Sequence, residues 1–152
     1  MQKHCRGKVI ESPPLIYLHQ LLICVNSDTQ TALLITKWLT CSPPPPEWIH
    51  GFDLVYECNT IQILKGPIRA EAITAISDLV APGGEILVSC RSRNTGEGLN
   101  TFPVALDKDE IDGFQRSGLL ETHFSAYNDN QNPPVPHFFA IYKRSTYKPS
   151  QK

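Results

Sequence analysis

Two short apolar segments, separated by one segment of helix length, constrain the fold of this chain more than any other feature. The segments FDLVYEC (52–58) and EILVSC (85–90) are rich in strand-forming residues, and their length is typical of strands buried within a sheet. Between them, Pro67 starts a segment of helical periodicity, and the run APGG at 81–84 ends it. The order strand, helix, strand predicts a right-handed crossover between parallel strands, and therefore an α/β fold.

The segment IRAEAITAISDLV (68–80) predicts a helix with one apolar face. Its spacing leaves Arg69, Glu71 and Ser77 for the solvent side. The pair Gly83-Gly84 that follows is interpreted as turn chemistry between helix and strand, and not as a phosphate-binding loop.

A capping box and two strand-like segments follow. Asp107 with Glu110 three residues later predicts the start of a helix, and Gly118 lets the chain turn after it. LETHFSAY (120–127) alternates, which predicts its even-numbered residues on one side of a strand. HFFAIYKR (137–144) is strand-like as well. Two consecutive strands without a helix between them predict an antiparallel hairpin.

The first third of the chain has a less regular pattern. Residues 1–14 show no periodicity and end in a double proline, so we expect a poorly ordered leader. LIYLHQLLICV (15–25) fits a strand or a short buried helix, with the strand favoured, and TALLITKWL (31–39) predicts a short amphipathic helix. These patterns divide the chain into a divergent, partly irregular segment 1–45, a half-domain 46–146 and a polar tail 147–152.

Composition argues against several classes of partner. A chain of 152 residues with a formal net charge of -1 has room for one core and shows no basic face, so nucleic acid is not a predicted partner. No apolar run approaches the roughly 20 residues that span a bilayer, so we expect a soluble, cytoplasmic protein without a membrane partner. The five cysteines form no CxxC pair and the histidines lack ligand-like spacing, which predicts neither disulfides nor a metal site.

Several segments, taken in order, resemble class I S-adenosylmethionine-dependent methyltransferases. FDLVYE (52–57) resembles the fourth strand of that family, SDLVAPGGEILV (77–88) its turn into the fifth strand, and the region 106–119 its next helix. PPEW (45–48) fits a loop that precedes the fourth strand in a bacterial subgroup. The resemblance implies a Rossmann-like, mostly parallel twisted sheet that ends in an antiparallel β-hairpin. It also implies S-adenosylmethionine as the cofactor and a small molecule as the methyl acceptor.

The sequence departs from that family in its first half. No GxGxG motif precedes Phe52, although the family uses such a loop to hold the methionine part of the cofactor. An acidic residue that would bind the ribose is not recognisable either: Asn26 lies in a faintly similar context, and another alignment puts Lys37 at the adenine-recognising position. We therefore expect a fold that is incomplete at the N-terminus, with exposed strand edges that lead either to marginal stability or to self-association of the chain.

Glu57, Cys58 and Asn59 are the candidate cofactor-binding residues. They lie at the carboxyl end of a predicted parallel strand, where ligands bind in open α/β sheets. The resemblance implies that this stretch faces the sulfonium of the cofactor and the incoming acceptor. The alternative is structural, with Glu57 capping a neighbouring helix and Asn59 forming a turn. Methyl transfer to a good nucleophile depends mainly on alignment, so no catalytic residue is named.

The run Gly96-Glu97-Gly98 is interpreted as a flexible loop near the mouth of the substrate site. Two functions are open on the sequence. The first is S-adenosylmethionine-dependent methyl transfer to an unidentified small acceptor. The second is a truncated or inactive relative, or an interaction module, without catalytic activity. The contrast between the irregular first third and the regular remainder supports the second.

Overall fold

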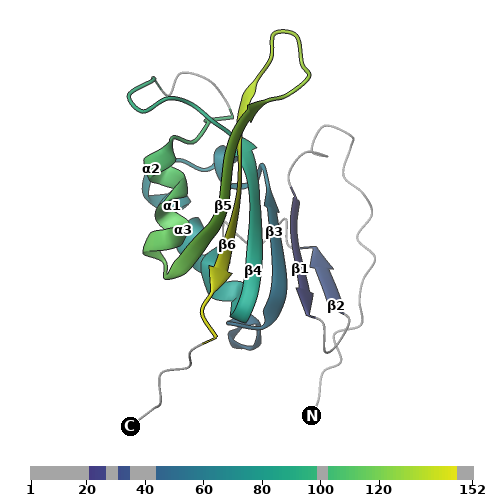
Figure 1. The fold of residues 1–152 in the computed structure, drawn as a ribbon. Helices are drawn as coiled ribbons and strands as arrows, with labels where there is room; N and C mark the ends of the chain where they lie inside the picture. The colour runs from purple at the N-terminus through teal and green to yellow at the C-terminus, as the bar shows by residue number, and fades with distance from the viewer. Residues whose placement is uncertain (1–20, 27–30, 35–43, 99–102, 147–152) are drawn as a thin grey trace, which may run out of the picture.

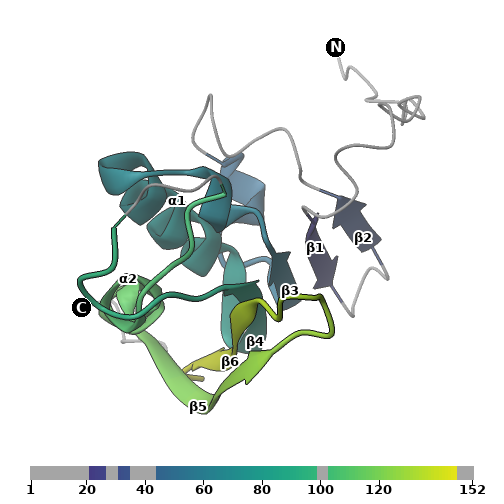
Figure 2. The ribbon, with the colours of Figure 1, turned by 90° about the horizontal axis from the view of Figure 1, so that it is seen from above.

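The chain forms one mixed β-sheet with helices on one face (Figures 1 and 2). The computed structural model describes residues 21–26, 31–34, 44–98 and 103–146. In these residues the sheet has the strand order β2-β1-β3-β4-β6-β5. The strands are β1 (Leu21–Asn26), β2 (Thr31–Leu34), β3 (Phe52–Cys58), β4 (Val80–Arg91), β5 (Leu119–Asn128) and β6 (Pro136–Arg144). The helices are α1 (Gly66–Leu79), α2 (Lys108–Ile111) and α3 (Gly113–Arg116), with short 3-10 turns η2 (Pro46–Trp48) and η3 (Ile61–Ile63).

The predicted strand, helix, strand unit is confirmed. β3 and β4 pair in parallel, and α1 connects them with Pro67 in its first turn. Apolar residues of α1 and of the two strands meet in the core, namely Ile73, Ile76, Leu79, Val55, Ile86 and Val88. The prediction that Arg69 and Ser77 face the solvent is wrong, because both are buried. The Ser77 hydroxyl donates to the carbonyl of Ile73 at 2.8 Å, so its burial leaves no donor unpaired.

The glycine pair lies in an irregularity at the start of β4. Phe52 pairs with Val80 and Leu54 with Glu85, so one residue of β3 faces four residues of β4. Gly83 has a φ of 80°, which favours glycine. At Gly84, a Cβ atom would lie 2.9 Å from the carbonyl oxygen of Asp53. Gly83 therefore permits a positive φ, and Gly84 permits a close approach of two backbone segments, as the interpretation as turn residues predicts.

The C-terminal hairpin is confirmed, and its second strand lies inside the sheet. β6 pairs antiparallel with β4 on one side and with β5 on the other. The capping box is present: the Asp107 carboxylate accepts from the N–H of Glu110, and the Glu110 carboxylate accepts from the N–H of Asp107. Phe114 of α3 stacks on Tyr142 of β6 at a ring distance of 5.2 Å, which ties the helices to the sheet.

Two predictions about strand direction and type need correction. The sheet is not mostly parallel, because in the described residues only β3 and β4 pair in parallel. β1 runs antiparallel to β3 and to β2, with a four-residue connection to β2 that only an antiparallel pair allows. The predicted helix at 31–39 is wrong for Thr31–Leu34, which form β2, since pairing with β1 outweighs local propensity. Residues 35–39 and 15–20 lie outside the described residues, whereas Leu21–Asn26 confirm the favoured strand.

The position of β1 in the sheet bears on the expectation of exposed strand edges. This strand pairs along β3 from Leu21 to Val25, so the described sheet has β2 and β5 as its outer strands. Among the described residues, no helix combines the length and apolarity needed to cross a membrane.

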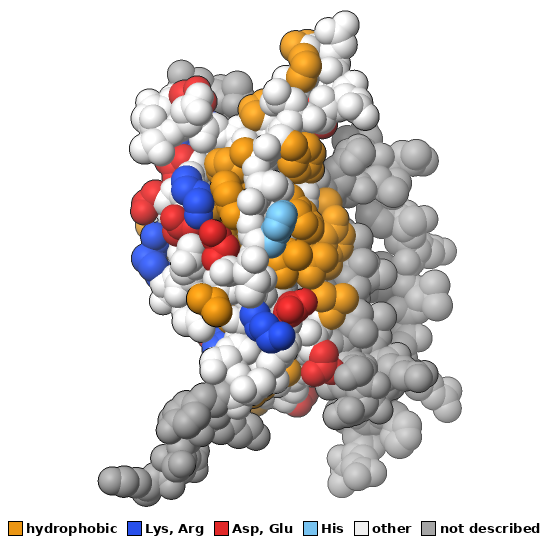
Figure 3. All heavy atoms as spheres, viewed as in Figure 1, with side chains coloured by type: hydrophobic (Ala, Val, Ile, Leu, Met, Phe, Trp, Pro, Cys, Tyr) orange, Lys and Arg blue, Asp and Glu red, His pale blue; other side chains and the backbone are white. Residues whose placement is uncertain are grey.

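The opposite face of the sheet carries no helix in the described part of the chain, and Figure 3 shows apolar side chains gathered there. Large apolar residues with substantial exposure include Leu54, Leu120 and Tyr127. A register shift between Glu121 and His123 interrupts β5. The predicted alternation of 120–127 is therefore wrong as a continuous pattern: Leu120 is 69% exposed, whereas Phe124 packs against the core.

Replacing Gly84 by alanine tests the close approach at the start of β4. The added methyl group would meet the carbonyl oxygens of Phe52 and Asp53, which cannot move without disturbing the β3–β4 pairing. We expect Gly84→Ala to lower the free energy of unfolding by about 1–3 kcal/mol in urea denaturation. Ser89→Ala, on the same strand, should change it by less than about 0.5 kcal/mol. Equal effects of the two substitutions would contradict the close approach.

Candidate functional site

The carboxyl ends of β3 and β4 lie at the same edge of the sheet, because the two strands are parallel. β3 leads there into η3, and β4 leads into the segment 92–107. The backbone N–H of Val104 donates to the carbonyl of Gln62 at 2.9 Å, so these two connections contact each other. The Gln62 side chain in turn accepts from the N–H of Arg91 at 2.8 Å. This edge is where sequence reasoning places the site.

Glu57 is completely buried at the end of β3. Its Oε1 atom accepts from the N–H groups of Thr60 at 2.6 Å and Ile61 at 2.9 Å, which caps η3. Burial raises the pKa of Glu57 to about 7, although these two hydrogen bonds act in the opposite direction. The other carboxyl oxygen, Oε2, is buried and has no hydrogen-bond partner among the described residues. Glu57 therefore has a structural role through Oε1, whereas its Oε2 atom makes no hydrogen bond to the described residues.

Asn59 and Cys58 follow at the same strand end. Asn59 has a φ of 61°, and its N–H donates to the carbonyl of Ser89 at 2.8 Å, so it forms the turn out of β3. Its Oδ1 atom is buried and also has no hydrogen-bond partner among the described residues. Burial raises the pKa of the Cys58 thiol, which keeps it protonated and poorly nucleophilic. The structural interpretation is thus supported, because Glu57 caps η3 and Asn59 forms a turn. Each of the two side chains also has one buried oxygen atom that accepts no hydrogen bond from the described residues.

A buried charge cluster fixes the segment after β4. The Arg69 guanidinium donates to the carbonyls of Leu64 (2.8 Å) and Val104 (2.7 Å) and to the Glu110 carboxylate (2.6 Å). The other Glu110 oxygen accepts from Arg93 at 2.8 Å. Arg93 also pairs with Asp107 at 3.0 Å. Periodicity did not reveal Arg69, because a cation inside the apolar helix face gives no repeating signal.

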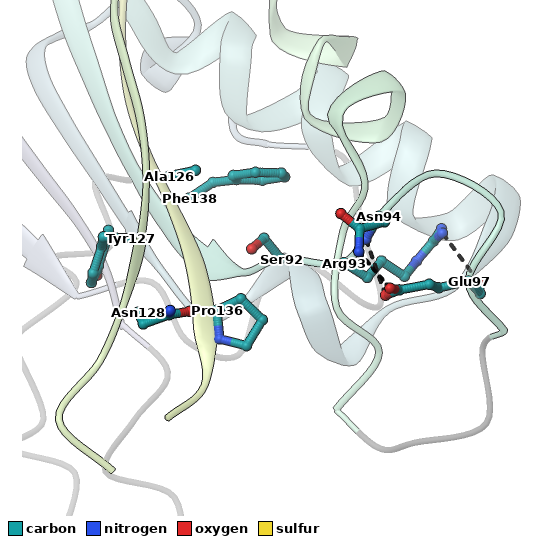
Figure 4. Close-up of a pocket in the computed structure, with 9 residues that line it drawn as sticks. All are labelled: Ser92, Arg93, Asn94, Glu97, Ala126, Tyr127, Asn128, Pro136 and Phe138. Atoms are coloured by element: carbon teal, nitrogen blue, oxygen red, sulfur yellow. Dashed lines mark hydrogen bonds between the residues drawn. The ribbon is translucent and has the colours of Figure 1, made fainter. Parts of the chain in front are cut away.

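A cavity of about 360 Å³ lies between the loop after β4 and the β5–β6 hairpin (Figure 4). Its lining comes from Ser92, Arg93, Asn94, Glu97, Ala126, Tyr127, Asn128, Pro136 and Phe138. Figure 4 shows Phe138 directed from β6 toward the loop, whereas Tyr127 lies on the other side of the hairpin. Tyr127 stacks there on His137 at a ring distance of 5.5 Å. The sequence interpretation placed a loop of this kind near the substrate, but hairpin residues such as Phe138 carried no signal for a site.

The cavity has an apolar floor and a polar rim. Phe138 is mostly buried and packs against Phe124 at a ring distance of 5.1 Å. On the rim, the Glu97 carboxylate accepts from the backbone and side-chain N–H groups of Asn94, and these hydrogen bonds lower the pKa of Glu97. Glu97 is therefore anionic at neutral pH. A cavity with an apolar floor and a few polar groups suits a small ligand.

No family model matches the sequence, and no curated protein is similar to it. Solved structures are similar in fold. One is 1,6-didemethyltoxoflavin-N1-methyltransferase of Burkholderia thailandensis with bound S-adenosylhomocysteine, which has a TM-score of 0.53 and 10% identity over 64% of this chain and 45% of that chain. Another is the N-methyltransferase NodS of Bradyrhizobium japonicum WM9, with a TM-score of 0.50 and 17% identity over 70% of this chain and 56% of that chain.

A third similar structure is the [4+2]-cyclase SpnF, with a TM-score of 0.55 and 10% identity over 71% of this chain and 56% of that chain. The chain thus spans about half the length of the structures it matches. The fold is similar to that of class I S-adenosylmethionine-dependent methyltransferases, and the resemblance drawn from the sequence motifs is confirmed at the level of the fold.

The buried carboxyl group of Glu57 should make stability depend on pH. The folded chain keeps a proton that the unfolded chain releases between about pH 4.5 and 7. The contribution of Glu57 to the free energy of unfolding is therefore largest below pH 4.5, and it falls as the pH rises to 7. The expected fall is about 3 kcal/mol. Glu57→Gln keeps an acceptor for Thr60 and Ile61, and it should remove this part of the pH dependence in urea unfolding at pH 5 and 8. An unchanged slope would contradict the buried, protonated carboxyl group.

The Arg69 cluster should be essential for stability. Arg69→Leu leaves the carbonyl groups of Leu64 and Val104 and the Oε1 atom of Glu110 without their donor, and we expect the free energy of unfolding to fall by about 3 kcal/mol or more. Arg116→Leu provides the matched control, since Arg116 pairs with Asp109 in an exposed position and should cost under about 1 kcal/mol. Chemical denaturation of both variants gives their free energies of unfolding. Similar decreases in the two variants would contradict a larger contribution of the buried cluster than of an exposed ion pair.

Proposed function

We propose that this protein is a methyltransferase-like domain that transfers a methyl group from S-adenosylmethionine to a small acceptor. The observation that carries the proposal is a juxtaposition at one sheet edge. Two buried acceptor atoms, Glu57 Oε2 and Asn59 Oδ1, lie at the end of β3 without a hydrogen-bond partner in the described part of the chain, and a cavity of about 360 Å³ lies beyond the end of neighbouring β4. The fold supports the proposal through its similarity to methyltransferases.

In its ionised form, which a pKa of about 7 allows at neutral pH and above, Glu57 would accept through Oε2, and Asn59 through Oδ1, from donor groups of the cofactor such as its ammonium or its ribose hydroxyls, because buried acceptors are normally hydrogen-bonded. When bound, S-adenosylmethionine would supply an electrophilic methyl group carried on a sulfonium. Cys58 lies between the two acceptors and stays a neutral thiol, so it would not compete as a methyl acceptor. The contribution of this chain would be to align the acceptor molecule and to keep water away from it.

A second candidate is a methyltransferase-like domain without catalytic activity. β1 runs antiparallel along β3, and no GxGxG motif precedes Phe52. The glycine-rich loop that holds the methionine part in the methyltransferase family therefore has no counterpart in this sequence. Similar folds also have other activities, as the [4+2]-cyclase SpnF illustrates.

Calorimetric titration with S-adenosylhomocysteine separates the two candidates. We expect saturable heat in the micromolar range for the chain, and binding about tenfold weaker for Asn59→Gly, which loses one acceptor but keeps the positive φ. His123→Ala, on the face without helices, should bind as the parent chain does. Absence of heat at high micromolar ligand would favour the domain without catalysis.

A further inference from the structure

We infer that the cavity between the loop 92–97 and the β5–β6 hairpin recognises its ligand through a cationic amine group attached to an apolar, planar body. This inference rests on the proposed function and deepens it, because it specifies the chemical class of the acceptor. It follows from the charges on the cavity lining, from their partners, and from the apolar floor.

Arg93 lines the cavity, but its donors are directed to the protein. Nε donates to the carbonyl of Ala105 at 3.0 Å, Nη2 to Glu110 at 2.8 Å, and Nη1 lies 3.0 Å from an Asp107 oxygen. The side chain is held in this position because both carboxylates belong to the capping box of α2. Among the described lining residues, no other arginine or lysine is present. A carboxylate or phosphate group entering this cavity would therefore meet no available cation among its described lining residues, and a further arginine, Arg91, lines the adjoining pocket.

Glu97 is the other charged residue of the lining. Its carboxylate accepts from Asn94, which is neutral, and no ion pair to this carboxylate is present among the described residues, although Arg93 Nη1 donates to the backbone carbonyl of Glu97 at 3.4 Å. The hydrogen bonds from Asn94 orient the carboxylate on the rim, as Figure 4 shows. Of the two charged lining residues, Arg93 is already paired with Asp107 and Glu110, whereas the Glu97 carboxylate has no ion pair among the described residues. A ligand cation would gain an ion pair here without displacing an existing one.

The apolar floor of the cavity would contact the apolar, planar body of the ligand. Phe138 and Ala126 come from neighbouring positions of the hairpin, since they pair with each other across β5 and β6. The ring of Pro136 adds apolar surface at the start of β6. An aromatic ring attracts both planar apolar groups and cations that lie over its face. The Ser92 hydroxyl lies between floor and rim in Figure 4.

Matched probe compounds test the inference by NMR titration of the isotope-labelled chain. Phenethylamine carries the cation, 3-phenylpropionate the anion, and phenethyl alcohol neither. We expect phenethylamine to shift the amide signals of Ser92, Asn94 and Glu97 and to bind at least about fivefold tighter than 3-phenylpropionate, a preference that 0.5 M salt weakens. Glu97→Gln should abolish the preference, whereas Glu71→Gln, at an exposed position of α1, should keep it.

Three results would overturn the inference: equal or tighter binding of 3-phenylpropionate, a preference that persists in Glu97→Gln, or no shifts with any of the three probes. Glu97 is exposed, so the variant should keep the circular dichroism spectrum of the parent chain. Calorimetry with S-adenosylhomocysteine on the same samples keeps the two proposals apart. Cofactor binding without an amine preference would overturn the inference alone, and an amine preference without cofactor binding would support this site while overturning the proposed function.

Discussion

The buried guanidinium of Arg69 is the interaction on which the sheet edge with the candidate site depends. It lies on α1 yet donates to carbonyls of the η3 region, to the carbonyl of Val104 and to Glu110, so it joins segments from three parts of the chain. Glu110 is itself half of the capping box that starts α2, and it also holds Arg93. One cation therefore sets the position of the loop after β4, and with it the wall of the cavity. Burying the Arg69 charge costs hydration free energy, and the hydrogen bonds to carbonyl groups together with the ion pair to Glu110 offset that cost.

The parallel pair β3–β4 and the antiparallel strand β1 have different implications for function. The parallel pair directs two connections to the same edge, which creates a place for a ligand. On the other side of β3, β1 runs in the opposite direction, so its connection to β2 begins near the start of β3. That arrangement completes the hydrogen bonding of β3 and places the end of β1 beside the start of β3, away from the edge where β3 and β4 end. The methyltransferase-like part and the N-terminal strands thus share a sheet while differing in what they contribute to a site.

Local patterns in the sequence predicted the elements whose own residues determine them. The strand FDLVYEC, the capping box of Asp107 and Glu110, and the turn at Gly118 need no distant partner to be recognised. The direction of β1, the strand at Thr31–Leu34 and the bulge in β5 depend on pairing, which periodicity cannot show. Glu57, Cys58 and Asn59 lie at the strand end as predicted, but which Glu57 oxygen caps η3 depends on how the chain turns after β3, and the sequence pattern does not show that turn. The cavity residues of the hairpin gave no signal, since apolar strand residues look alike whether they face a core or a ligand.

The absence of helices from one face of the described sheet has a practical consequence for experiments. Side chains such as Leu54, Leu120 and Tyr127 contact water in the native state, so environment-sensitive dyes would already fluoresce with the folded protein. A thermal scan that relies on such a dye would begin from a bright baseline and could even lose signal on melting. The indole of Trp48 packs against the core beside Phe52, so in a variant without Trp38 its fluorescence offers a probe that reports on the folded interior instead.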